Sequence, residues 1–212
     1  MRLIQTSSVT LQMLETMTQK NKIYKFPFNF NHAIWATAIL LEKIDEDVHY
    51  LDLASLLYIA ERNHLTIEGE MLIGGTIYAM KHGPILGQAF RLIKGYDVSR
   101  SDEWARHIRI LPKTHCVRLI HFPENFRLWS EQRKYLYNAV NRYYGEKRNR
   151  LSKLVRLFPE WKKHRPTTME KRRIIPWEEI LKARGREDMI EKVNHHFEIM
   201  QFVEEKLCKL RQ

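Results

Sequence analysis

The sequence predicts a compact α+β domain that is mostly α-helical, with a small β element between helices and a long C-terminal helix. Apolar residues recur every three or four positions in residues 51–60 and 187–210, as in amphipathic helices. Short apolar runs between these stretches are broken by glycine and proline, which favours strands and turns. A chain of 212 residues with 44% hydrophobic content can form a well-buried core. We therefore expect a lead-in over 1–30, one domain over 31–185 and an amphipathic helix over 186–212.

The first predicted helix covers residues 32–44 and follows the lead-in, which fits either an arm or a strand-rich segment. Asn31 is a suitable N-cap for it, and Phe30 can pack on Trp35 as a hydrophobic staple. The next helix should bury one face, formed by Leu53, Leu56, Leu57 and Ala60.

The segment after the second helix contains several glycines. Met71–Ile73 and Ile77–Met80 are short apolar runs separated by Gly74-Gly75, which predicts either a small hairpin or a tight extended loop. Pro84 then suits the first turn of a helix that ends near Gly95.

The second half of the chain contains a predicted antiparallel strand pair followed by helices. The strands are expected at residues 106–111 and 116–122, with a helix capped by Ser130 after them. A further helix is expected from residue 149. The C-terminal helix either docks on the domain or pairs with another chain.

Positive charge is concentrated in the second half of the chain. Residues 1–100 contain 10 basic and 10 acidic residues, so the net charge of +11 arises entirely from residues 101–212. Residues 142–173 alone contain 12 basic and 3 acidic residues. This run can attract an acidic protein or a nucleic acid, or it can be the solvated face of core helices.

Several functional classes lack their usual sequence signals. No apolar run reaches the roughly 20 residues of a membrane span, and the two cysteines argue against a disulfide framework, so we expect a cytoplasmic protein. His195 and His196 are adjacent, which on a helix directs them about 100° apart, so we expect no metal site. The sequence shows no phosphate-binding loop or nucleophile elbow, so we expect neither cofactor nor catalytic residue. His82 is interpreted as a partner contact, a general base or an ordinary half-exposed histidine.

Two motifs in the first half carry a family resemblance. The run LLYIAERNHL, followed by a glycine and by TIYAMKHGP before another predicted helix, resembles the core of the Panacea domain of SocA-like antitoxins. The resemblance covers roughly residues 31–181, and its last part, residues 174–181, resembles the short helix that closes the family's core. The chain departs from the family pattern in the IGG that precedes Thr76 and in Ile85-Leu86 after Gly83-Pro84.

The resemblance implies an antitoxin, often encoded on a phage or mobile element, that blocks a toxin from a neighbouring gene by direct contact. An adaptor that delivers the toxin to a protease is a second mechanism of the family. Glu61-Arg62 then forms either a buried ion pair or a solvated one. The alternatives are a nucleic-acid-binding regulator that uses the basic second half and an enzyme built on His82, Glu61 and Tyr78. Besides the toxin, a second copy of the chain is a candidate partner, bound through the last helix. Candidate partner contacts are Tyr78, Lys81 and His82 beside the Gly-Pro turn, and Arg148, Arg150 and Lys153 in the basic run.

Overall fold

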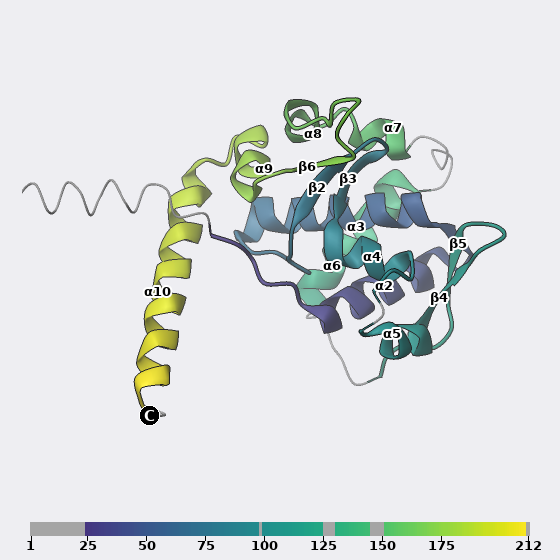
Figure 1. Cartoon of the computed structure of the whole chain (residues 1–212), viewed down its shortest axis with the longest axis horizontal. Coiled ribbons are helices and arrows are strands. Elements are labelled where there is room, and N and C mark those ends of the chain that lie inside the picture. The colour runs from purple at the N-terminus through teal and green to yellow at the C-terminus, as the bar shows by residue number, and fades with distance from the viewer. Residues whose placement is uncertain (1–23, 98, 125–129, 145–150, 211–212) are drawn as a thin grey trace, which may run out of the picture.

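The computed structural model describes residues 24–97, 99–124, 130–144 and 151–210. It confirms the predicted class, a mostly helical α+β fold with small antiparallel sheets (Figure 1). In chain order the elements are α2 (Phe30–Ile44), β1 (Val48–His49), α3 (Tyr50–Glu68), β2 (Ile77–Met80), β3 (Gly83–Leu86), α4 (Gly87–Ile93), α5 (Ser101–His107), β4 (Ile108–Leu111), β5 (Cys116–Leu119), α6 (Ser130–Tyr143), α7 (Leu151–Val155), α8 (Pro159–Lys163), β6 (Arg172–Ile174), α9 (Trp177–Ala183) and α10 (Asp188–Leu210).

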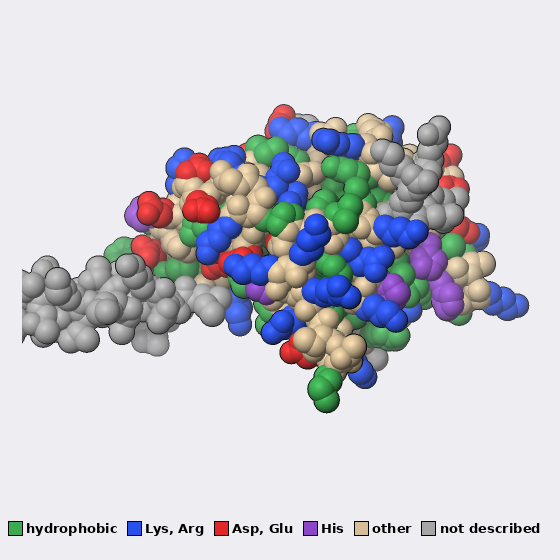
Figure 2. Space-filling model, turned by 90° about the horizontal axis from the view of Figure 1, so that it is seen from above, with side chains coloured by type: hydrophobic (Ala, Val, Ile, Leu, Met, Phe, Trp, Pro, Cys, Tyr) green, Lys and Arg blue, Asp and Glu red, His purple; other side chains and the backbone are tan. Residues whose placement is uncertain are grey.

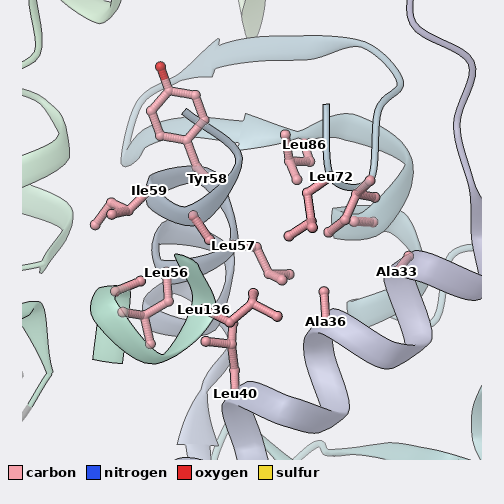
Figure 3. Packing of buried hydrophobic residues seen from close by; sticks show 14 of the residues in the cluster. Ala33, Ala36, Leu40, Leu56, Leu57, Tyr58, Ile59, Leu72, Leu86 and Leu136 are labelled. Atoms are coloured by element: carbon pink, nitrogen blue, oxygen red, sulfur yellow. The ribbon is translucent and has the colours of Figure 1, made fainter. Parts of the chain in front are cut away.

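Helix α3 is the centre of the fold. All residues from 53 to 62 are buried, so the helix is enclosed around its whole circumference rather than on the single face that its apolar spacing predicts. Figure 3 shows Leu56, Leu57, Tyr58 and Ile59 directed to different sides of α3, among residues of α2, α6 and β3. A helix in this position can hold several surrounding elements at once.

Two three-stranded antiparallel sheets lie beside α3. One has the order β1-β5-β4 and confirms the predicted pairing of the strands near residues 110 and 117. The other has the order β3-β2-β6. In this second sheet Met80 is opposite Gly83, so Lys81 and His82 form the tip of the β2–β3 hairpin.

The position of this hairpin decides between two alternatives and corrects one prediction. Residues 71–73 form a loop, as in the extended-loop alternative, and Ile77–Met80 pairs with Gly83–Leu86 instead of with residues 71–73. Pro84 therefore lies in a strand, and the helix begins at Gly87. Proline is tolerated in β3 because this is an edge strand, where a missing N–H can face away from the partner strand.

The start of α2 also differs from the prediction. The N-cap is Asn29, whose side-chain oxygen accepts the N–H of His32, and Phe30 is already the first helical residue. Phe30 therefore does not precede the cap, as the predicted staple requires, and the ring of Trp35 packs edge-to-face on Phe122. Asn29 and Asn31 both have side chains that suit an N-cap, and in the structure the earlier of the two, Asn29, is the cap.

Helix α10 confirms the predicted long C-terminal helix, and its first half packs on the domain. Met189 and Val193 are buried, and the ring of Phe197 stacks on Tyr24 at 5.1 Å. The second half extends beyond the body of the domain (Figure 1). The predicted boundaries at residues 30 and 185 remain predictions, and residues 1–23 of the lead-in lie outside the described residues.

Among the helices that the structure describes, none is both long and apolar enough to span a membrane.

Candidate functional site

The motif Tyr58-Ile59-Ala60-Glu61-Arg62 lies in the enclosed part of α3. Tyr58 and Glu61 have no exposed surface, and Arg62 is 6% exposed. Burying three polar side chains is costly unless each has hydrogen-bond partners. Their partners show what the motif does.

Glu61 holds the loop that leads into β2. Its carboxylate accepts the N–H of Ile73 at 3.0 Å and the N–H of Gly74 at 2.8 Å. Burial raises the pKa of Glu61 to about 7, and the hydrogen bonds from these backbone N–H groups oppose this increase. At Gly74, where φ is +75°, an added Cβ would lie 2.1 Å from the backbone oxygen of Pro27. Gly74, the first glycine of the IGG segment, is therefore required, because any side chain there would clash with the backbone of Pro27.

Arg62 does not pair with its neighbour Glu61, as one interpretation of the sequence proposed, but with Glu160 of α8. Its Nε donates to Glu160 Oε1 at 2.5 Å, and its Nη2 donates to Oε2 at 3.3 Å. The Tyr58 hydroxyl donates to the same Oε1 at 2.7 Å, and the Arg62 guanidinium lies 4.2 Å from the centre of the Phe158 ring. Burial, together with the Glu160 carboxylate, raises the pKa of Tyr58 well above its ordinary value. This network joins α3 to a helix about 100 residues later in the chain.

Helix α8 in turn fixes the end of β2. Trp161, next to Glu160, donates its indole N–H to the backbone oxygen of Met80 at 3.0 Å. On the other strand, an added Cβ at Gly83 would lie 2.5 Å from Val155, so α7 packs directly against the backbone of the hairpin. We call these five residues, Tyr58, Glu61, Arg62, Glu160 and Trp161, the internal frame, because they connect α3, the loop, α8 and the hairpin.

The predicted contact residues of the hairpin have different environments. Lys81 and His82 are exposed at its tip, immediately after the backbone group that Trp161 binds. Tyr78 is half-buried, and the guanidinium of Arg172 lies 4.6 Å from the centre of its ring. Glu61 is enclosed against backbone, whereas His82 faces solvent, so the structure separates these two residues of the enzyme alternative.

The predicted contacts of the basic run are only partly described. Lys153 is exposed on α7, whereas Arg148 and Arg150 lie outside the described residues. The resemblance implied a helix over residues 174–181, whereas the structure has strand β6 up to Ile174 and helix α9 from Trp177. The signal for the strand was the short run Ile174-Ile175 before Pro176, which suits an edge strand as well as a helix start.

Strand β6 places basic residues from the end of the basic run next to the tip of the β2–β3 hairpin. Arg172 lies opposite Met80, one residue before Lys81. Lys162 and Arg165 flank Trp161, whose ring is 5.9 Å from the Arg165 guanidinium. We call the exposed cations of this region the basic rim, consisting of Lys81, Lys162, Arg165, Lys171, Arg172 and Arg173.

Figure 2 views the side on which α7, α8 and β6 lie, and shows Lys and Arg side chains spread across the middle of this face among hydrophobic ones. Of the two acidic residues in 153–173, Glu160 is buried against Arg62, and Glu170 pairs with Arg173 at 3.1 Å. The rim is therefore strongly positive, and its groups are suited to carboxylates or phosphates.

Within the described part of the chain, no three His, Cys, Asp or Glu side chains are placed so that they could hold a metal ion.

Comparison with known proteins gave one match. A family model described as the Panacea domain of SocA-like antitoxins matches residues 53–162, slightly more than half of the chain. No curated protein and no solved structure matches. The matched range contains the complete internal frame and the β2–β3 hairpin, whereas β6 and α10 lie beyond it.

Proposed function

The chain belongs to the family of SocA-like antitoxins with a Panacea domain, and we propose that it neutralises a toxin by binding it directly. The observation that carries this proposal is the match over residues 53–162. The toxin is expected to be the product of a neighbouring gene, on a phage or another mobile element. Both proteins would act in the cytoplasm.

The geometry supports a binding function in which the antitoxin supplies no catalytic group. The polar residues of the central motif are bonded to the protein itself, where they fix the hairpin. The exposed groups next to this hairpin are cations and a histidine, which can contact an acidic protein surface. Delivery of the toxin to a protease is a second mechanism compatible with such a surface, because an adaptor also acts by binding.

Co-expression with the neighbouring gene tests this function. We expect that gene product to arrest growth, and the wild-type antitoxin to restore growth and to co-purify with it. Replacing both Lys81 and His82 with alanine should weaken rescue while leaving the melting temperature unchanged, because both side chains are exposed at the hairpin tip.

Lys113→Ala is the matched control for this experiment, since Lys113 is exposed in the turn between β4 and β5. It should rescue as well as wild type. A harmless gene product that does not co-purify would refute the antitoxin proposal. Full rescue by the Lys81 and His82 double variant would place the toxin contact elsewhere.

The basic rim supports a second candidate function, that of a nucleic-acid-binding regulator. A protein that neutralises six to ten phosphates loses roughly 10³–10⁵ in affinity between 50 and 200 mM salt. Such a steep dependence for duplex DNA would favour this function. We prefer toxin binding because the matching family is one of antitoxins.

We also propose that α10 forms a homodimer with a second copy of the chain. Met200, Val203 and Leu207 are separated by three and four residues and are 42–48% exposed, so the apolar stripe continues beyond the docked part of the helix. Two such stripes can pair and bury one another.

Replacing Met200 and Leu207 with glutamate is expected to keep the protein monomeric, whereas the wild type should become dimeric as its concentration rises in sedimentation equilibrium. Burial of two carboxylates from each helix would oppose association. Glu205→Gln, an exposed change on the same helix, should leave the dimer intact. A wild type that stays monomeric at high concentration would refute the pairing.

A further inference from the structure

Strand β6 has one edge bonded to β2 and one edge that no described strand covers. The N–H of Ile175 donates to the backbone oxygen of Ile77, so Ile175 faces β2. Because backbone groups alternate in an antiparallel pair, Arg173 also bonds to β2 through its partner Ala79. The N–H and C=O groups of Arg172 and Ile174 therefore point outward.

The side chains on this edge are accessible. Every residue of β6 is exposed, and Ile174 is 56% exposed although it is a large apolar residue. Arg172 and Ile174 are two residues apart and share one face of the sheet, where Arg172 covers the ring of Tyr78. The edge thus presents a cation and an apolar side chain together with backbone groups to which no strand of the described residues is bonded.

The surrounding charge determines which strand can add to this edge. Lys171 and Arg173 flank Arg172 in the chain, and Lys81 of the basic rim directly follows Met80, the residue opposite Arg172. Charged residues on an edge strand oppose pairing with another copy of the same basic strand. An acidic strand would instead be attracted.

We propose that the outer edge of β6 binds an extended, acidic segment of the toxin by strand addition. The bound strand carries a carboxylate opposite Arg172 and an apolar residue two positions away, opposite Ile174. A peptide is favoured over a nucleic acid because only a peptide strand offers N–H and C=O groups at the spacing of Arg172 and Ile174. This inference rests on the proposed antitoxin function and adds the mode of toxin binding.

Amide hydrogen exchange, measured by NMR on the full chain with and without the neighbouring gene product, tests the inference. In the free protein the amides of Arg172 and Ile174 should exchange fast, and that of Arg173 slowly. In the complex the first two should slow by at least about tenfold, because they become hydrogen-bonded, while that of Arg173 changes little.

A pair of variants tests the same backbone group by affinity. Ile174→Pro removes the outward N–H and should weaken toxin binding roughly tenfold, while the melting temperature stays near that of wild type because edge strands tolerate proline. Ile174→Ala keeps the N–H and should bind more tightly than the proline variant. If the proline variant has a lower melting temperature, its weaker binding can reflect unfolding. The hydrogen-exchange measurement on the wild type then decides whether the toxin bonds to the edge of β6.

The outcomes separate this inference from the proposed function. A gene product that is neither toxic nor bound refutes the function and the inference together. Rescue and binding with unchanged exchange at Arg172 and Ile174 refute the inference alone. Binding of a short duplex DNA instead of the gene product, with steep salt dependence, would also refute it and would assign the edge to nucleic acid.

Discussion

Replacing Glu160 with alanine is expected to lower the free energy of unfolding by about 3–5 kcal/mol, because the change leaves the Arg62 guanidinium buried without a counter-ion. The Tyr58 hydroxyl also loses its acceptor. Removing one partner of a buried ion pair is far more costly than removing an exposed one, since water cannot replace the lost carboxylate. Urea denaturation of the wild type and the variant measures the difference.

Glu170→Ala is the matched control for Glu160→Ala, because Glu170 pairs with Arg173 while both side chains are 44–46% exposed. This change should cost no more than about 1 kcal/mol. In addition, replacing Arg62 with methionine together with Glu160 with leucine should recover much of the stability, since neither charge is then left buried. Equal effects of Glu160→Ala and Glu170→Ala would contradict the role assigned to the internal frame.

The stability of the protein is expected to fall as pH rises from about 4.5 to 7, because of Glu61. Burial raises the pKa of its carboxyl to about 7 in the folded protein, whereas the unfolded chain has the ordinary value of 4.5. Between these values the folded state binds a proton that the unfolded state has released. The contribution of Glu61 to the free energy of unfolding therefore decreases by roughly 3 kcal/mol and becomes constant above pH 7.

Urea denaturation at pH 5 and pH 8 for the wild type and for Glu61→Gln isolates this contribution. Other shifted groups, such as His64, whose pKa burial lowers, are present in both proteins and cancel in the comparison. The glutamine variant should lack the decrease that Glu61 causes. Equal pH dependence in the two proteins would show that Glu61 does not titrate in this range.

The sequence by itself determined the elements whose signal is local. The apolar spacing of Leu53, Leu56 and Leu57 located α3, and the repeat over residues 187–210 located α10. An amphipathic helix is recognised by apolar residues that recur every three or four positions. This pattern lies within one short segment, so it can be read without knowing the rest of the fold. The motifs around Tyr58 and Tyr78 also identified the family, which the match over residues 53–162 confirms.

The tertiary structure alone decided how these elements are bonded and which surface they expose. Glu61 and Arg62 are adjacent in sequence, yet one binds the loop at Gly74 and the other binds Glu160. Strand β6 exists because β2 offers an edge to residues about 95 positions later, and no pattern within residues 172–174 specifies that partner. Hydrogen bonds and ion pairs between distant segments depend on which groups the folded chain brings within about 3 Å of one another. Local sequence therefore predicted α3 and α10, whereas the internal frame and the exposed edge of β6 became visible only in the folded protein.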